Sequence, residues 1–248
     1  GIKVALSGLG ADELFGGYPS HRLMPWLMAL RWLPEGLRLQ ALQLSSPRLA
    51  RKLTGLPRWD RWHLCLALRS WSNDATLMAA GLPSLQWPES APYRITQAWG
   101  QTSWAELFGY TEPMLLRDSV AMSMACGLEL RVPFLDHQLV EIALRMPQRF
   151  QKPGIELLRQ TCSDLIPPGY LNRPKQGFAL PMAAWMRGPL QGLCSSRLEQ
   201  LEQSGWIDPA WLQQQWAAFE AGQLNWPRAW CLVVLGEFGR RKNMPLIS

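Results

Sequence analysis

The chain opens with a short apolar run that stops at a glycine-rich turn. Residues 2–6 read IKVAL, and Ser7, Gly8 and Gly10 follow. A run of this kind predicts a strand that is buried on both faces of a parallel sheet. Such a sheet needs neighbouring strands, and the next hundred or so residues offer no convincing one. The lone strand therefore indicates a piece of a longer chain.

Most of the chain is patterned for helices that proline and glycine separate. We expect helices over about 20–33, 38–53, 60–71 and 74–80. The stretch 82–103 holds several prolines and is interpreted as an irregular connection. The fragment is therefore predicted to be mostly helical.

Capping residues mark the later helices. Thr111 is expected to cap a helix that has Pro113 in its first turn and ends at Gly127. Asp136 is expected to cap a helix that stops before Pro147. Two more helices are expected, one from Asp208-Pro209 to about Gly222 and one opening at residues 225–227. Tryptophans at helical spacing, as at Trp211 and Trp216, are interpreted as core.

Composition limits the classes of protein. With 248 residues, 48% hydrophobic and 18% charged, the chain can bury a core and is not a disordered tail. No apolar run reaches the roughly 18–20 residues of a membrane span, and no signal peptide is visible. The five cysteines are scattered without a CxxC pair, which is typical of reduced thiols in a cytoplasmic protein. The three histidines have no metal-ligand spacing, so we expect no zinc site.

The net charge of +6 permits a nucleic-acid partner. The arginines are spread along the chain, however, and no basic run of five or more occurs. Arginines that meet carboxylates or phosphates of a small substrate explain the same excess. We therefore expect a small-molecule ligand and no nucleic acid.

The first candidate site is residues 7–18. Gly8 and Gly10 allow a tight turn, and Asp12 and Glu13 follow it. Ligands of open α/β sheets bind at the carboxyl ends of strands, and backbone N–H groups at glycines can reach a phosphate. Mg²⁺ typically takes one or two carboxylates together with phosphate oxygens. The stretch is either a nucleotide site or a plain turn in which Asp12 caps the next helix.

The second candidate site lies around Glu129 and Arg131. These residues flank one leucine in an extended stretch before Pro133, so they should point the same way. Upstream, Ser119 and Ser123 share one helix face. An ionised pair among apolar residues is either a structural ion pair or part of a site.

The third candidate is Lys175, which lies on an expected loop between Pro174 and Gly177. A lysine held in this way could bind a phosphate group. A solvated lysine without a ligand explains the pattern equally well.

Taken in order, three stretches resemble one family closely. They read SGLGADELFGGY, MSMACGLELRVPFLDHQLVE and RPKQGFALPMAAWMRGPL. They are similar to the synthetase domain of glutamine-hydrolysing asparagine synthetases. The resemblance covers nearly the whole chain: a strand and nucleotide turn in 1–18, a weakly similar helical region in 19–110, and a helical region with the later motifs in 111–248.

The resemblance implies a fold and a reaction. The family fold is α/β, a parallel sheet of the adenine nucleotide α-hydrolase (PP-loop) type with a large helical region, of which this chain would hold mainly helices and a remnant of the sheet. The reaction adenylates a carboxylate with ATP and Mg²⁺ and releases pyrophosphate, and ammonia then attacks. The implied partners are a carboxylate such as aspartate, an N-terminal glutaminase domain of the same parent chain, and a second copy in a homodimer. No membrane partner is implied.

The resemblance also assigns roles by matching position. Ser7 and Gly8 would lie against the AMP portion of the nucleotide, with Gly10 in the same turn. Asp12 would help to bind Mg²⁺-pyrophosphate, and Glu13 would lie beside it.

For the later motifs, the resemblance implies that Glu129 and Arg131 shape the acyl side of the site. Lys175 matches a lysine that meets the phosphates and the developing charge of the intermediate. A fixed cation aimed at transition-state charge is among the largest catalytic contributions.

The chain departs from the family pattern in several places. The SGGxDS pyrophosphate loop and the cysteine nucleophile of the glutaminase are absent from these residues and are expected upstream, so the isolated chain is expected to be inactive. Leu9 stands where asparagine synthetases usually have glutamate, and Val120 where many relatives have aspartate. Three functions remain open: an asparagine synthetase, an amide or lactam ligase for another carboxylate, and a degenerate binding domain.

Overall fold

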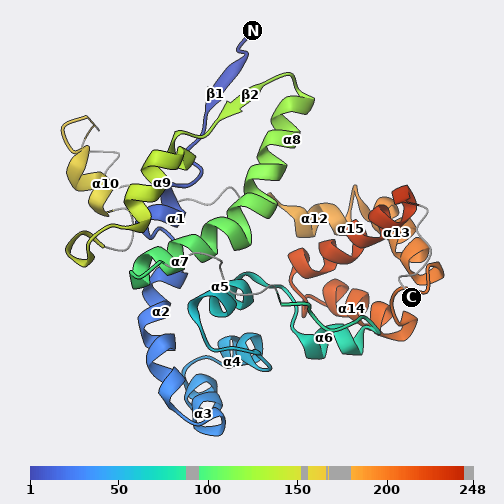
Figure 1. Ribbon diagram of the computed structural model, residues 1–248. Coiled ribbons are helices and arrows are strands. Elements are labelled where there is room, and N and C mark those ends of the chain that lie inside the picture. Colours follow the sequence, from blue (N-terminus) through green and yellow to red (C-terminus); the bar gives the residue numbers. More distant parts are fainter. Residues whose placement is uncertain (88–94, 152–155, 166, 168–179, 243–248) are drawn as a thin grey trace. The chain divides into compact units, whose positions relative to one another are not determined.

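The computed structural model describes residues 1–87, 95–151, 156–165, 167 and 180–242. By their contacts the chain divides into two compact units (Figure 1). The first combines Gly1–Ser70 with Trp87–Pro174, and the second combines Trp71–Gln86 with Lys175–Ser248. As the sequence predicted, the described part of the chain is mostly helical, and it also contains a two-stranded parallel sheet. The division of the sequence into 1–18, 19–110 and 111–248 stays a prediction.

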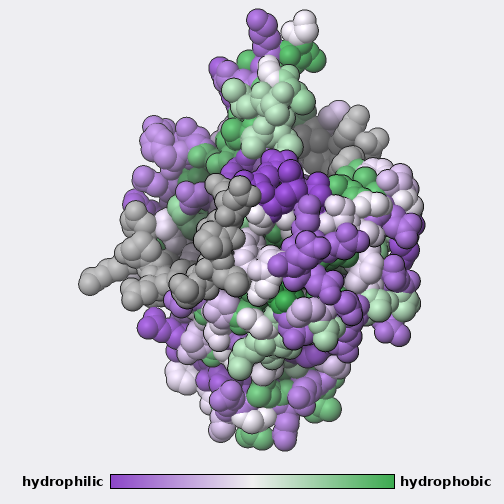
Figure 2. Space-filling view, turned by 90° about the vertical axis from the view of Figure 1, so that its right-hand side faces the viewer, coloured by the Kyte–Doolittle hydropathy of each residue, from purple (hydrophilic) through white to green (hydrophobic). Residues whose placement is uncertain are grey.

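The sheet joins two segments of the first unit that are far apart in the sequence. Strand β1 (Val4–Leu6) pairs in parallel with β2 (Glu129–Arg131), in the extended stretch that the sequence indicated. The expected burial on both faces is wrong for these residues, because Val4 is 41% and Leu6 74% exposed. Hydrophobic (green) side chains accordingly lie on the surface at the strand end of this unit, at the top of Figure 2. Two strands of three residues present too little area to cover.

The first helices of this unit follow the strand. They are α1 (Ala11–Phe15), α2 (Pro19–Ala29), the 3₁₀ turn η1 (Leu30–Trp32), α3 (Glu35–Ser45), α4 (Pro47–Leu53) and α5 (Arg61–Arg69). The single helix expected over 38–53 is wrong, because it divides at Ser46. The Ser46 hydroxyl accepts a hydrogen bond from the Leu49 N–H at 3.3 Å, and Pro47 starts the new helix, where its missing N–H costs nothing. Leucines from these helices, among them Leu27, Leu42 and Leu64, form the core.

One long helical stretch crosses the unit. It consists of α7 (Ala98–Glu106), the π-helical segment η2 (Leu107–Leu116) and α8 (Arg117–Ala125). Two expectations are therefore wrong: 82–103 is not wholly irregular, and Thr111 does not cap a helix but lies buried inside one. Pro113 also lies inside the helix. A proline cannot donate to the regular helical ladder, and the π-type i→i+5 pattern gives the chain another register there.

The remaining elements of this unit follow α8 in the sequence. Gly127 ends α8 with φ 68°, as predicted. The 3₁₀ turn η3 (Pro133–Leu135) leads to α9 (His137–Leu144), and Asp136 caps α9 as expected by accepting from the Gln138 N–H at 3.0 Å. The turn η4 (Gln148–Phe150) and helix α10 (Glu156–Thr161) follow. Leu14 and Phe15 of α1 pack in one core cluster with Ala143 of α9.

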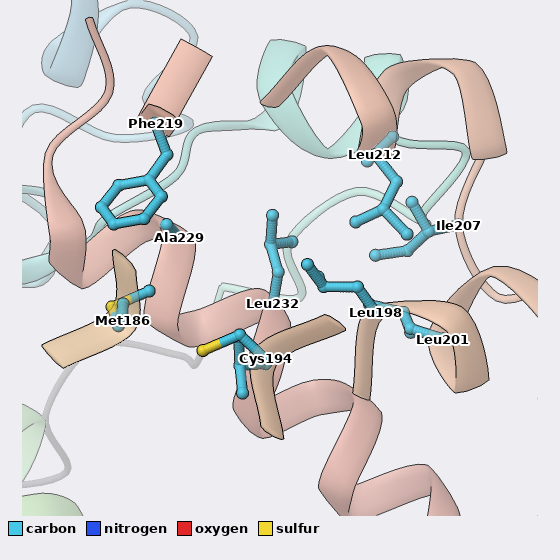
Figure 3. Packing of buried hydrophobic residues seen from close by; sticks show 11 residues of the cluster. Met186, Cys194, Leu198, Leu201, Ile207, Leu212, Phe219, Ala229 and Leu232 are labelled. Carbon is cyan, nitrogen blue, oxygen red and sulfur yellow. The ribbon is translucent and has the colours of Figure 1, made fainter. Parts of the chain in front are cut away.

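The second unit is a helical bundle. Its helices within the described residues are α6 (Asp74–Ala79), α12 (Met182–Arg187), α13 (Gln191–Gln203), α14 (Pro209–Glu220) and α15 (Trp226–Lys242). Asp208 caps α14 as predicted and accepts from the Trp211 N–H at 2.7 Å. Figure 3 shows side chains such as Met186, Phe219 and Leu232 gathered in its core. The tryptophans Trp211 and Trp216 pack against this core, as expected.

No helix among the described residues is long and apolar enough to cross a membrane.

Candidate functional site

The parallel pairing of β1 and β2 brings the first two candidate stretches to one end of the sheet. Leu6 lies opposite Arg131, and the Ser7 N–H donates to the Arg131 carbonyl oxygen at 2.8 Å. The glycine-rich turn therefore begins beside the end of β2. This is the strand end at which open α/β sheets place their ligands.

The two glycines of the turn differ in the space around them. Gly10 has φ 98°, and a Cβ there would lie 2.6 Å from the Cδ2 atom of Leu135, so only glycine fits. Around Gly8, by contrast, a Cβ would meet open space. The Leu9 N–H donates to the Ser7 Oγ atom at 3.3 Å, which folds the turn back toward the strand. Tight packing at Gly10 thus fixes the backbone, while Gly8 leaves room for a ligand to approach.

The two adjacent carboxylates point in different directions. Asp12 is half-buried, and Gly17 donates its N–H to the Asp12 carbonyl oxygen at 2.8 Å. A Cβ on Gly17 would collide with the Asp12 carboxylate. Gly16, with φ 75°, ends helix α1 and brings Gly17 to this position. Two glycines thereby leave the space that the Asp12 side chain occupies.

Glu13 enters the interior instead. Its Oε1 atom accepts hydrogen bonds from the Tyr18 hydroxyl at 2.9 Å and from the Thr111 hydroxyl at 2.7 Å. Successive residues of a helix point about 100° apart, so one carboxylate stays at the turn while the next faces the core. Glu13 links α1 to the π-helical segment η2, and its predicted place beside a metal ligand stays a prediction.

Beneath this turn lies a second buried carboxylate, Glu106 of α7. Arg69 of α5 donates to its Oε2 atom through Nε at 2.8 Å and forms an ion pair with it through a terminal nitrogen at 2.7 Å. The Arg69 guanidinium also lies over the rings of Tyr18 and Tyr110, at 3.9 and 4.2 Å from their centroids. Cation–π contacts and a buried ion pair thus connect α5, α7 and η2 under the candidate site.

The buried groups have shifted pKa values. Burial raises the pKa of Glu106, and the charge of Arg69 opposes that shift. Burial, followed by the charge of Arg69, lowers the pKa of His21 to about 4, so His21 is neutral at pH 7. Burial and the charge of Glu13 raise the pKa of Tyr18, which keeps the hydroxyl protonated and able to donate. The charges beneath the turn are therefore fixed at neutral pH.

The other candidate residues are exposed or lie elsewhere. Arg131 donates to the Glu129 carboxylate at 2.7 Å, so the two side chains do point the same way. Both are more than half exposed, which leaves guanidinium and carboxylate atoms open to a ligand. Val120 of α8 is also exposed. Lys175 lies outside the described residues.

The residues at the sheet end fit part of a Mg²⁺-nucleotide site. In the described part of the chain, no three His, Cys, Asp or Glu side chains gather closely enough to hold a metal ion. Asp12 offers one carboxylate, and Mg²⁺ bound with a nucleotide typically uses one or two in addition to phosphate oxygens. Gly8 and the Ser7 hydroxyl offer the small, polar surface that a phosphate or ribose requires.

Sequence reasoning missed the buried network. Arg69, Glu106, His21 and Thr111 were not singled out as partners. The usable signal was Glu106, a carboxylate in the apolar stretch Trp104 to Phe108, because a buried charge requires a partner.

A comparison with models of protein families shows the family to which the chain belongs. Residues 1–238 match the family model described as asparagine synthase. The chain belongs to the asparagine synthase family. The motif at residues 7–18, whose geometry is described above, therefore lies within the matched domain.

Curated relatives agree. A Mycobacterium tuberculosis (strain H37Rv) protein named "Putative asparagine synthetase (glutamine-hydrolyzing)" is 32% identical over 202 residues, which cover 75% of this chain and 31% of the relative. The Bacillus subtilis protein "Asparagine synthetase (glutamine-hydrolyzing) 1" is 27% identical over 228 residues, 86% of this chain and 36% of the relative. The human asparagine synthetase is 52% identical over 61 residues, 22% of this chain and 11% of the relative.

This asparagine synthase family chain thus spans about a third of the length of the first two of these relatives. No significant match to a solved structure is found.

Proposed function

We propose that the chain is part of an ATP-dependent amide ligase of the asparagine synthetase type. The parent enzyme would adenylate a carboxylate, with aspartate as the first candidate, and ammonia would then displace AMP to form the amide. The observation that carries this proposal is the junction at the sheet end. There the turn of residues 7–12 begins beside Arg131, whose side chain pairs with Glu129, within a domain that matches the family over residues 1–238.

The turn would bind the nucleotide. The open surface at Gly8 admits the AMP portion, and the Ser7 hydroxyl and neighbouring N–H groups can hydrogen-bond to it. Asp12 would hold Mg²⁺, which when bound stabilises the charge of the pyrophosphate leaving group. The glycines at 16 and 17 keep the Asp12 side chain at the turn.

The Glu129–Arg131 pair would bind the acyl substrate. Arginine has five N–H donors in a planar fork, so an exposed Arg131 paired with one carboxylate can still bind another. Lys175 would meet the phosphates and the charge that develops as the adenylate forms, as the family resemblance implies. We also propose that the parent protein has a parallel sheet of the PP-loop type and an upstream glutaminase domain.

The experiment uses the full-length parent protein, supplied with aspartate, ATP, Mg²⁺ and ammonia. Pyrophosphate release and asparagine formation are measured together. Asp12→Asn should lower kcat by about 10²-fold, the size expected for one preorganised electrostatic group. The matched control is Glu141→Gln, an exposed carboxylate on α9, which should leave kcat unchanged.

A parent that releases no pyrophosphate with any carboxylate would refute the proposed reaction. Equal loss of activity in both variants would show that Asp12 has no special place in it.

A further inference from the structure

The net positive charge of the chain is concentrated in one segment. Residues 19–70 contain nine lysines and arginines and only two acidic residues, whereas the rest of the chain contains 16 basic and 17 acidic residues. The net charge of +6 thus arises entirely within helices α2 to α5 and their connections. The arginines are spread along the chain, and the local excess arises because residues 19–70 contain so few acidic residues.

Several of these arginines have no carboxylate partner. Arg22, Arg31, Arg48 and Arg58 are exposed. Within the described ranges, none of the four forms an ion pair with an acidic side chain. The acidic residues of the segment are few, and Asp60 accepts hydrogen bonds from the His63 backbone and ring instead. The segment therefore presents charge that the unit does not neutralise.

Large apolar side chains are exposed on the same helices. Trp32 is 77% exposed, Leu37 54% and Leu44 89%, and Trp26 and Leu33 are also exposed. The Arg31 guanidinium lies over the Trp32 ring at 4.4 Å from its centroid. At the end of this unit formed by α3, lowest in Figure 2, hydrophobic and hydrophilic side chains are interspersed.

We infer that one surface of α2, η1, α3 and α4 docks on an anionic lipid bilayer. This α2–α4 surface consists of Arg22, Arg31, Arg48, Trp26, Trp32, Leu33, Leu37 and Leu44. Tryptophan and leucine enter the headgroup region of a membrane, while arginines meet the lipid phosphates. Each basic residue near an anionic membrane increases binding about fivefold, so several together give stable attachment. The protein would lie on the membrane without crossing it.

Other anionic partners fit less well. A nucleic acid would match the charge, and its bases could stack on Trp32, but it offers no apolar surface for Leu37 and Leu44. An acidic protein would bind chiefly through a compact central cluster of buried side chains. Here the apolar side chains are distributed over α2, η1 and α3, with arginines on the same and adjoining helices. A fluid bilayer accepts such side chains independently of one another.

This inference does not depend on the proposed reaction, because no candidate site residue lies within residues 19–70. Its test uses the 248-residue chain and sucrose-loaded vesicles that sediment. One vesicle preparation contains one-third phosphatidylglycerol in phosphatidylcholine, and the other contains phosphatidylcholine alone. We expect sedimentation with the anionic vesicles only, and release by high salt.

Two matched triple variants locate the binding surface. Arg22→Gln/Arg31→Gln/Arg48→Gln removes three charges from the surface and should weaken vesicle binding on the order of 10²-fold. Arg145→Gln/Arg149→Gln/Arg228→Gln removes the same charge from exposed positions elsewhere and should change binding by less than about fivefold. Circular dichroism confirms that both variants are folded.

A third variant separates lipid from nucleic acid. Leu37→Ser/Leu44→Ser should weaken vesicle binding at least tenfold and leave any binding of single-stranded RNA unchanged. Three results would overturn the inference: no binding to anionic vesicles, equal losses in both arginine variants, or unaltered vesicle binding by the leucine variant. Tighter binding to RNA, dependent on the same arginines and independent of the leucines, would assign the surface to nucleic acid instead.

Discussion

Replacing Arg69 with methionine tests the buried network beneath the candidate site. The substitution keeps an apolar stem but leaves the fully buried Glu106 carboxylate without its cation. Breaking a buried pair in this way costs about 3–5 kcal/mol. Loss of the contacts with Tyr18 and Tyr110 adds about 1 kcal/mol. At pH 8 the free energy of unfolding of the first unit should therefore fall by about 4–6 kcal/mol.

The size of this loss should depend on pH. Folding raises the pKa of Glu106. Its buried negative charge therefore lowers the stability of the folded state as the pH rises above the ordinary carboxyl range. Without Arg69 that pKa rises further, so the Glu106 carboxyl should be protonated to a greater extent at pH 5 than at pH 8 and should cost less stability there. His21 has the opposite effect on the pH dependence of stability in the unsubstituted chain. Because its folded pKa is about 4, stability is lost as the pH falls below 6.5.

Arg69 is one cause of the low His21 pKa, so removing it also reduces that acid-side loss. Both groups therefore make the variant's destabilisation smaller at pH 5 than at pH 8. Tyr18 and Cys65, which also face the network, have raised pKa values and remain protonated over this range.

Urea unfolding followed by circular dichroism at both pH values measures the effect. Hydrogen exchange in peptides from α5 and α7 assigns it to the first unit. The matched control is Arg69→Met/Glu106→Leu, which removes both charges and should recover most of the lost stability. A loss below about 1 kcal/mol for Arg69→Met, or a loss equal at both pH values, would refute the reasoning.

Three further predictions concern the parent enzyme. Gly17→Ala should displace the Asp12 carboxylate and lower pyrophosphate release at least about tenfold, whereas Gly36→Ala, which meets open space, should have no effect. Lys175→Ala should lower kcat by roughly 10²-fold with an unchanged unfolding midpoint, and near-normal turnover would contradict its assigned role. Leu9→Glu should increase asparagine formation from aspartate, because a carboxylate can assist the attacking ammonia; an unchanged rate would count against this.

Local patterns allowed a correct prediction of most helices and their caps. Asp136 and Asp208 cap the helices that they were expected to cap, and Gly127 ends α8. These features depend on hydrogen bonds within a few residues, so the sequence around each one is sufficient. The strand at 4–6 and the extended stretch at 129–131 were also found locally.

The failures arose where tertiary contacts decide. Thr111 and Pro113 look like a helix start, but the hydrogen bond from Thr111 to Glu13, far away in sequence, accompanies their position inside the π-helical segment. Asp12 and Glu13 are adjacent in sequence, but only the helix geometry shows that their side chains point in different directions. The concentration of charge in residues 19–70 was visible in the sequence, but a search for uninterrupted basic runs cannot detect charges that helical periodicity spaces apart.

In the π-helical segment η2, the number of residues should be more strictly constrained than the identity of each residue. Deleting one residue between Leu107 and Leu116 could restore a regular α-helix, but it would rotate every residue beyond it by about 100°. The faces of α8 would then change phase relative to Glu13 and to the strand that follows. Substitutions on the exposed side of η2 should be tolerated, whereas single insertions and deletions there should be rare among functional homologues.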